Sequence, residues 1–307
     1  MARCLEGLDR QVHPPEQVLA VVRREDGETM RMLADSPRHP YELTVVTVAE
    51  PGLVKSLNAG LAQAEGDILA VTDDDAVPRL DWLARLEDHF RARPEVGGVG
   101  GRDFVGGPQL AEPGPEGKSP RTVGKIRWYG RVAGNHHLGA GPPREVDVLK
   151  GANMSFRRSA LRGIQVDERL RGSGAQVHFE IGLCLAVKRA GWELLYDPAV
   201  AVDHYPSQRF DEDQRGRQPS GALRNEVHNE TYTLLRWLPW WRKVVALAWG
   251  LLVGSRKAPG ALLAVERLLH EPDGAAVAAR SRTALEGRLQ GLATFGRALR
   301  DDRAGRR

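Results

Sequence analysis

The feature that most constrains this chain is a short apolar run that ends in three consecutive carboxylates. Residues 68–71 have the length and composition of a buried strand, and Asp73, Asp74 and Asp75 follow directly. Adjacent like charges repel one another, and a divalent cation is an effective counter-ion for them. Because side chains alternate along an extended backbone, Asp73 and Asp75 point to one side and Asp74 to the other. The stretch predicts an Asp-x-Asp pair that holds one hard cation, with a solvated acidic turn or a helix N-cap as the alternative.

Strand and helix signals alternate around this stretch. Short apolar runs bounded by Gly, Pro or charge indicate strands, and apolar residues at helical spacing indicate helices. The predicted strands are residues 17–22, 43–48, 68–71, 96–101, 146–149 and 192–196, and the predicted helices are residues 4–11, 54–64, 82–93 and 179–189. Such alternation is typical of an α/β fold with a Rossmann-type sheet flanked by helices. The Gly- and Pro-rich residues 106–144 are expected to form a functional loop region, of the kind that sometimes contains a short hairpin.

Beyond Tyr205 the chain changes character. Residues 206–222 are polar and charged, which indicates a linker or lid, and residues 223–307 carry helical patterns. The last of these places Leu285, Leu289, Leu292, Phe295 and Leu299 on one helical face. We expect a C-terminal helical region after the α/β domain.

Three tryptophans stand next to cations in this C-terminal region. Trp237, Trp240 and Trp241 lie beside Arg242 and Lys243, a mixture typical of a membrane interface. The apolar run that follows is only about ten residues, too short to span a bilayer. The region therefore either contacts an anionic membrane surface or packs as a helical cap on the core.

Composition narrows the protein class. A chain of 307 residues can bury one substantial core and carry an appendage. A net charge of +4 is too small to indicate a nucleic-acid partner, so none is expected. Cys4 and Cys184 form no CxxC pair or disulfide framework, and no signal peptide is evident at the N-terminus. These properties favour a reducing, cytoplasmic compartment.

Four motifs, in this order, resemble glycosyltransferase family 2, the inverting nucleotide-sugar enzymes of the GT-A fold. They are residues 52–61 with the Asp triplet that follows, residues 81–83, residues 150–157 and residues 179–198. The likeness covers roughly residues 4–205 and implies a GT-A-like catalytic domain over residues 1–205. It implies a mixed sheet flanked by helices, with the C-terminal helices as an appendage.

The chain also departs from the family pattern. The family normally opens with a strand whose end cradles the nucleobase, and this chain begins after it, so either the natural start lies upstream of Met1 or the protein does without that strand. Arg23 and Arg24 replace the acidic residue that usually ends the next strand, which leaves Asp26 as a stand-in. The Glu-Asp pair of the family is reduced to Phe179-Glu180.

The resemblance assigns functions to individual residues. Glu180 is the expected general base, favoured by its apolar neighbour Phe179, although a glutamate in the first helical turn is also favoured by the helix dipole. His204 is a third metal ligand or a structural histidine, and Asn153 contacts the acceptor or a turn backbone. The expected donor-binding residues are Asp26, Asn58, Asp73, Asp74 and Asp75, the acceptor-binding residues Asn153 and Phe179, and the metal ligands Asp73, Asp75 and His204.

Together these features predict a metal-dependent, inverting glycosyltransferase. Mg²⁺ or Mn²⁺ would neutralise the diphosphate of a nucleoside diphospho-sugar, and the sugar would pass to a polysaccharide or lipid-linked acceptor. The expected location is cytoplasmic, or peripheral on the inner face of the cell membrane. One alternative is a nucleotidyltransferase, which would require a basic Gly-rich loop near the N-terminus that the sequence lacks. The other is a catalytically silent sugar-nucleotide or carbohydrate-binding protein.

Overall fold

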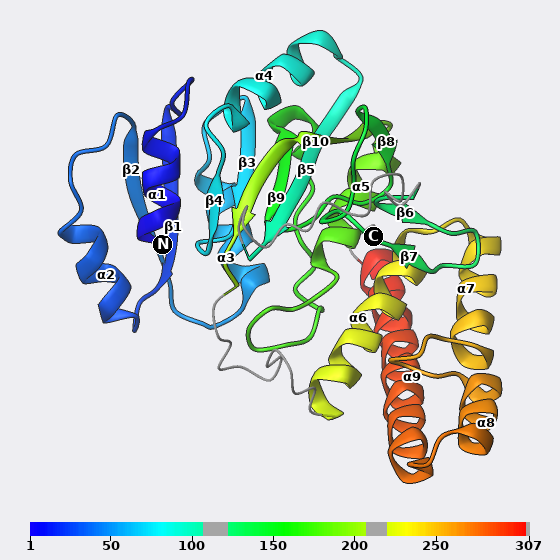
Figure 1. Cartoon of the computed structure of the whole chain (residues 1–307). Coiled ribbons are helices and arrows are strands. Elements are labelled where there is room, and N and C mark those ends of the chain that lie inside the picture. The colour runs from blue at the N-terminus through cyan, green and yellow to red at the C-terminus, as the bar shows by residue number, and fades with distance from the viewer. Residues whose placement is uncertain (107–121, 207–219, 305–307) are drawn as a thin grey trace.

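A computed structural model describes residues 1–106, 122–206 and 220–304 of the chain. A sheet flanked by helices is followed by a group of C-terminal helices that lie to one side of it (Figure 1). The strands are β1 (Gln17–Arg23), β2 (Glu42–Val48), β3 (Ile68–Thr72), β4 (Ala76–Pro78), β5 (Val96–Val105), β6 (Lys125–Ile126), β7 (Val132–Ala133), β8 (Arg144–Val146), β9 (Asn153–Arg157) and β10 (Glu193–His204). The helices are α1 (Ala2–Asp9), α2 (Gly27–Ala34), α3 (Leu53–Gln63), α4 (Trp82–Ala92), α5 (Phe179–Arg189), α6 (Ser220–Trp237), α7 (Trp240–Leu252), α8 (Ala261–His270) and α9 (Gly274–Ala304), with a 3₁₀ turn at Arg158–Leu161.

The main sheet is mixed and has the order β3-β9-β5-β10-β4, with β8 added on β10, within the described residues. β5 and β10 pair in parallel, whereas β9 runs antiparallel to both β3 and β5. The predicted α/β class with a mixed sheet is therefore confirmed. β4 lies at the edge of the sheet, and Pro78 ends it, in keeping with the restriction of proline to edge strands.

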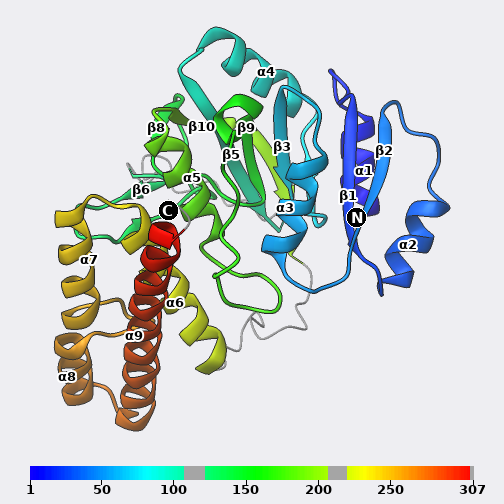
Figure 2. The same cartoon turned by 180° about the vertical axis from the view of Figure 1, so that it is seen from behind.

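β1 and β2 form a separate parallel pair (Figure 2). α3 packs on this pair, since a Cβ added at Gly60 would lie 3.2 Å from the Val21 side chain. Leu5 and Leu8 of α1 join the same hydrophobic cluster as Val22 and the fully buried Val99. The pair is thus connected to the main sheet by helices and not, in the described part of the chain, by a strand ladder.

The glycines of β5 allow two close approaches. The sequence predicts a strand beneath a nearby backbone or ligand here, and the structure provides the backbone. β10 bulges between Asp197 and Val202, and a Cβ on Gly101 would lie 1.6 Å from the Val200 carbonyl oxygen. A Cβ on Gly97 would lie 2.5 Å from the Cβ of Trp192. Any side chain at these positions would separate β5 from its neighbours.

α9 buries small residues and exposes its leucines. Cβ atoms added at Gly287 and Gly291 would lie 2.7 Å from the carbonyl oxygens of Arg224 and His228, so α9 approaches α6 closely. The predicted apolar face exists, but four of its five residues are exposed and only Phe295 is partly buried. The exposed members are Leu285, Leu289, Leu292 and Leu299.

Two predicted segments lie partly outside the described residues. They are most of the predicted linker 206–222 and residues 107–121 of the predicted loop region. The expected hairpin is present as β6 and β7. α2, β4 and α8 were missed, and each is short. The strand predicted at residues 146–149 corresponds to β8, which spans Arg144–Val146.

Candidate functional site

The aspartate triplet forms the turn between β3 and β4. Asp74 is turned away: its carbonyl oxygen accepts a 2.6 Å hydrogen bond from the Met1 amino group, and its carboxylate lies 3.8 Å from that group. Asp73 and Asp75 are half-buried and face inward. The alternation expected from the sequence is therefore observed, with the middle carboxylate on the outside.

The β4–β10 pairing places His204 beside this pair. His204 is the last residue of β10, and its backbone is in register with Ala76, the residue after Asp75. Its Nε2 lies 3.1 Å from Asp75 Oδ1. One ligand atom each from Asp73, Asp75 and His204 lies within 4.8 Å of the others. The three predicted metal ligands, distant in sequence, are thus brought together.

Asp103 lies behind His204 and was not predicted. It is fully buried on β5, its Oδ2 is 3.7 Å from His204 Nδ1, and it accepts a 2.6 Å hydrogen bond from Lys150 Nζ. Burial raises the pKa of Asp103, but the contacts with His204 and Lys150 lower it by more, so the pKa lies below its usual value. A carboxylate after the apolar run of β5 was the available signal.

The neighbouring carboxylates act on His204 in turn. Asp103 and then Asp75 raise the pKa of His204 to about 9, against a smaller opposing effect of burial. The imidazole therefore carries a proton at neutral pH when no metal is bound. Metal binding requires the neutral imidazole, so a cation would displace this proton.

The donor set fits a hard or borderline divalent cation. Two carboxylates and one imidazole suit Mn²⁺, and Mg²⁺ accepts the carboxylates. Both ring nitrogens of His204, and Oδ1 of Asp103, are buried without a well-aligned hydrogen bond in the described part of the chain. These ring nitrogens instead form ion pairs with the carboxylates of Asp75 and Asp103, and the ligand atoms of Asp73, Asp75 and His204 lie close enough together to hold one cation. Asp73, Asp75 and His204 are the residues that would hold it.

Glu180 lies in the first turn of α5, half-buried, beside the buried Phe179. The Phe179 ring packs on Gly151, where an added Cβ would lie 2.8 Å from the ring. Lys150, the residue before Gly151, contacts Asp103. Phe179, Gly151 and Lys150 thus connect the N-terminus of α5 to the acidic cluster, which we define as Asp73, Asp75, Asp103 and His204. Phe179 therefore supports the turn between β8 and β9.

The loop before α5 has a strained backbone. Gln176 and His178 have positive φ angles of 41° and 73°. Gln176 is held at both ends of its amide: Oε1 accepts a hydrogen bond from Val54 N at 2.9 Å, and Nε2 donates one to Leu170 O at 3.0 Å. Such strain is common at functional sites, and here it fixes the direction in which α5 begins.

Asn153 is buried and fully engaged. Its Oδ1 accepts a hydrogen bond from Trp82 Nε1 at 2.9 Å, and its Nδ2 donates to the carbonyl oxygens of Val200 at 2.8 Å and Arg102 at 3.3 Å. The side chain joins β9 to α4, β5 and β10. Direct contact of Asn153 with an acceptor stays a prediction, and the structural function is the one observed.

Two predicted donor residues also have structural contacts. Asn58 donates to Val166 O and accepts from Val166 N, both at 2.9 Å, and so fixes α3 to the segment before α5. Asp26 caps α2 by accepting hydrogen bonds from the backbone and hydroxyl of Thr29, which lower its pKa. Donor contact by Asn58 and Asp26 stays a prediction.

A polar hollow of about 430 Å³ lies where α3 begins, between Lys55, Glu168 and Arg171. It is lined by the loop before α5 and by Asn225 of α6 as well. None of Asp73, Asp75 and His204 lines it, so it is separate from the acidic cluster. None of the predicted site residues lines this hollow, although Val54 and Lys55 belong to the motif at residues 52–61.

Comparison with known families gives one match. The model of the family described as glycosyltransferase like family 2 matches residues 1–219. The match covers the separate β1–β2 pair, the main sheet and the acidic cluster.

Two curated relatives are similar in sequence. Glucosyl-dolichyl phosphate glucuronosyltransferase of Haloferax volcanii is 23% identical over 204 residues, which are 65% of this chain and 62% of the relative. An uncharacterised protein of Sinorhizobium fredii is 25% identical over 225 residues, 69% of this chain and 23% of the relative. The chain thus spans less than two thirds of the length of either relative.

Solved structures share the fold. A mannosyltransferase from Pyrobaculum calidifontis, in complex with GDP-Man and Mn²⁺, has a TM-score of 0.53 at 19% identity and covers 95% of this chain and 82% of its own. TarS residues 1–349 from S. aureus, in complex with UDP-GlcNAc, has a TM-score of 0.57 at 13% identity and covers 99% and 88%. These likenesses agree with the predicted GT-A-like architecture.

Proposed function

The chain belongs to glycosyltransferase like family 2, and on that premise we propose that it is a metal-dependent, inverting glycosyltransferase. The donor is a nucleoside diphospho-sugar, and the acceptor is a saccharide or a lipid-linked molecule. The observation that carries the proposal is the cluster of Asp73, Asp75 and His204, whose ligand atoms lie within 4.8 Å of one another. Structural neighbours in complex with GDP-Man and Mn²⁺ and with UDP-GlcNAc support the donor class and the metal.

The acidic cluster is assigned to the donor diphosphate. A Mg²⁺ or Mn²⁺ ion bound there would neutralise charge on the departing diphosphate. Asp73 and Asp75 would hold the ion from the β3–β4 turn, and His204 would complete the set from β10. Lys150, 2.6 Å from Asp103, keeps that buried carboxylate charged and so holds His204 in place.

Glu180 is assigned the proton transfer. As general base it takes the proton of the acceptor hydroxyl, whose oxygen attacks the anomeric carbon while the bond from that carbon to the diphosphate breaks. Attack opposite the leaving group inverts the anomeric configuration. Glu180 suits this function because it is half-buried and lies on the side of the Lys150–Asn153 turn where Phe179 packs.

The remaining predicted residues complete the site. Asp26, Asn58 and Asp74 are proposed to contact the donor, and Phe179 and Asn153 to shape the acceptor side. Asn153 acts by positioning, since its amide holds β9 against β5 and β10. The catalytic domain is proposed to span residues 1–205, with residues 206–222 as a linker or lid before the C-terminal helices.

One relative supports the proposed acceptor class. The name of the Haloferax relative contains a lipid-linked sugar, glucosyl-dolichyl phosphate, which supports a lipid-linked acceptor here. We place the reaction in the cytoplasm, at the inner face of the cell membrane. Among the described helices, none has the length and apolar character to cross a bilayer.

The test is release of free nucleotide from a panel of nucleoside diphospho-sugars. With Mn²⁺ and no acceptor, the purified chain should hydrolyse its own donor slowly, and EDTA should abolish the release because the diphosphate charge is then uncompensated. Excess Mn²⁺ added after EDTA should restore it. Release that EDTA leaves unchanged, or the absence of release from every donor, would contradict the proposal.

A further inference from the structure

The outermost C-terminal helices expose most of their apolar side chains. α7 has no fully buried residue, and α8 buries only Ala264. Trp240 and Leu269 are 78% and 76% exposed. Scattered exposed apolar residues are normal, but a concentration on neighbouring helices indicates an interaction surface. The other exposed apolar residues of α7 and α8 are Trp241, Val244, Leu252, Leu262, Val265 and Leu268.

The β6–β7 hairpin extends this surface. Arg242 of α7 donates hydrogen bonds from Nη2 to the carbonyl oxygens of Ile126 at 3.0 Å and Arg127 at 2.8 Å. The Tyr129 ring lies 4.3 Å from the ring of Trp249 on α7. Trp128, at the tip of the hairpin, is 64% exposed. The hairpin thus fixes a third exposed tryptophan next to Trp240 and Trp241 of α7. Figure 1 shows the β6–β7 hairpin beside α7.

α9 holds α7 and α8 in place. Arg288 of α9 is buried and donates hydrogen bonds to Ala258 O at 2.6 Å and Pro259 O at 3.2 Å, in the link between the two helices. Lys243 of α7 lies over the ring of Phe295. The apolar side chains are therefore presented outward on helices that are themselves anchored by specific contacts.

Charge separates this region from the rest of the chain. Residues 220–307 contain 15 Lys and Arg against 8 Asp and Glu, a net charge of +7, whereas residues 1–219 contain 29 against 32, a net charge of −3. Arg256 and Arg280 are among the exposed cations. Two copies of a region with a net charge of +7 repel each other, but an anionic bilayer attracts the cations next to its surface. The charge therefore favours lipid over a second copy of the chain.

We propose that this surface docks the protein on an anionic lipid bilayer. The outer face, which we define as Trp128, Trp240, Trp241, Val244, Leu262 and Leu269, enters the headgroup region, and the surrounding arginines and lysines contact lipid phosphates. The tryptophans suit this position because their rings are apolar and their N–H groups can reach water. The inference deepens the proposed function and rests on it only for the source of the acceptor.

The experiment is co-sedimentation of the full chain with lipid vesicles. Binding to vesicles with about a third phosphatidylglycerol should exceed binding to pure phosphatidylcholine at least tenfold, and high salt should weaken it. The variant Trp240→Ser/Trp241→Ser/Leu269→Ser should lose at least tenfold in binding. Because all three side chains are exposed, this variant should keep the thermal unfolding midpoint of the wild type.

A matched control replaces apolar residues that are exposed elsewhere. Leu80 and Val12, on the catalytic side, are 61% and 57% exposed, and Leu80→Ser/Val12→Ser should bind vesicles like the wild type. Equal loss in both variants would overturn the docking surface. Absence of vesicle binding together with a dimer that the triple variant dissociates in sedimentation equilibrium would overturn it in favour of self-association.

Nucleotide release in solution separates this inference from the proposed function. The triple variant should release nucleotide from the donor at the wild-type rate, since its substitutions lie away from the acidic cluster. Normal release without vesicle binding refutes the docking surface alone. Vesicle binding without release from any donor refutes the proposed function alone.

Discussion

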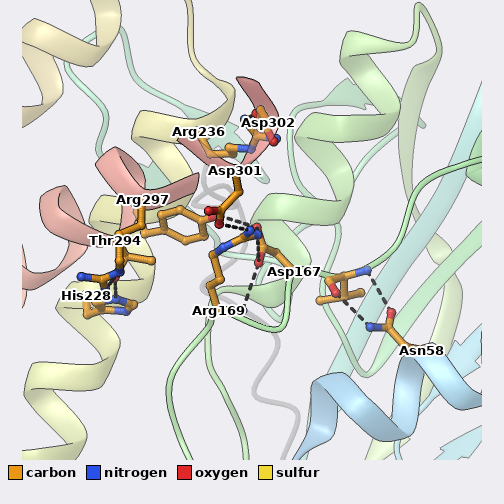
Figure 3. A network of polar contacts seen from close by, with 11 residues as sticks. Asn58, Asp167, Arg169, His228, Arg236, Thr294, Arg297, Asp301 and Asp302 are labelled. Carbon is orange, nitrogen blue, oxygen red and sulfur yellow. Dashed lines mark hydrogen bonds and ion pairs between the residues drawn. The ribbon is translucent and has the colours of Figure 1, made fainter. Parts of the chain in front are cut away.

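Two buried polar clusters of this chain differ in how completely they are hydrogen-bonded. At the end of β10, both ring nitrogens of His204 and Oδ1 of Asp103 make no well-aligned hydrogen bond within the described residues. Between α6 and α9, His228 is also buried, yet its Nδ1 lies 2.9 Å from Asn229 Oδ1 and its Nε2 2.9 Å from Thr294 Oγ1. Figure 3 shows the second cluster and the ion pairs around it.

The helical cluster joins the C-terminal helices to the catalytic part. Asn229 donates hydrogen bonds to the carbonyl oxygens of Arg171 and Val177, Arg169 pairs with Asp301 at 2.8 Å, and the Tyr232 hydroxyl contacts Asp167. A buried cluster that is fully hydrogen-bonded stabilises the fold, whereas one that keeps unpaired polar atoms has capacity for a ligand. We therefore propose a stabilising function for the helical cluster and a chemical function for the cluster at the end of β10.

The largest effect should come from removing the carboxylates of the first cluster. Asp73→Asn/Asp75→Asn should lower Mn²⁺ affinity and nucleotide release at least about a thousandfold, or about 4 kcal/mol, because both negatively charged ligands are lost. Isothermal calorimetry with Mn²⁺ and the release assay measure both. The control Asp67→Asn should change neither by more than about threefold, since this carboxylate is fully exposed and lies 3.7 Å from Arg158.

Asp302 provides a control with the opposite expected result, a change in stability without a change in Mn²⁺ affinity. Its carboxylate accepts hydrogen bonds from Arg236, and both side chains are only partly buried. Asp302→Asn should lower the free energy of unfolding by about 1 kcal/mol and leave Mn²⁺ affinity unchanged. If Asp73→Asn/Asp75→Asn instead cost stability and kept Mn²⁺ affinity, the two clusters would not differ as described.

Glu180, the proposed general base, is separate from the cluster of Asp73, Asp75 and His204. Glu180→Gln should keep donor binding and reduce sugar transfer at least about a hundredfold, because an amide cannot accept the proton of the acceptor hydroxyl. Donor binding is measured by calorimetry and transfer with the acceptor identified by screening. Normal turnover, together with a loss of up to about 1 kcal/mol in stability, would show that Glu180 only interacts with the helix dipole.

His228 gives the helical cluster a pH dependence. Burial lowers the pKa of His228 to about 4, against the opposing hydrogen bond that Asn229 Oδ1 accepts from Nδ1, and the charges of Arg171 and Arg297 add smaller lowering effects. The unfolded chain protonates this histidine below its ordinary pKa of 6.5, and the folded chain does so only near 4. Stability should therefore fall as the pH falls from about 6.5 to 4, by about 2 to 3 kcal/mol.

Denaturant unfolding at a series of pH values measures this effect. His228→Gln should remove that part of the pH dependence while lowering the stability at neutral pH. Parallel pH curves for the wild type and the variant would mean that His228 does not titrate differently in the two states. The variant should leave Mn²⁺ affinity unchanged, which again separates the two clusters.

The sequence by itself determined the α/β class, most strands of the main sheet and the acidic turn. These features depend on local patterns: apolar runs of strand length, helical spacing, and three carboxylates after a buried strand. Asp73 and Asp75 lie close together as predicted, although they do so in a turn between β3 and β4 and not on an extended strand.

Only the tertiary structure decided which distant residues meet and which faces are buried. Asp103 joined the cluster through the pairing of β5 with β10, and Asn153 proved to be buried because Trp82, Arg102 and Val200 converge on it. The leucines of α9 are exposed because glycines on its other face allow closer contact with α6 than leucines would. Sequence periodicity identifies the faces of a helix, but the fit between two backbones selects the one that is buried.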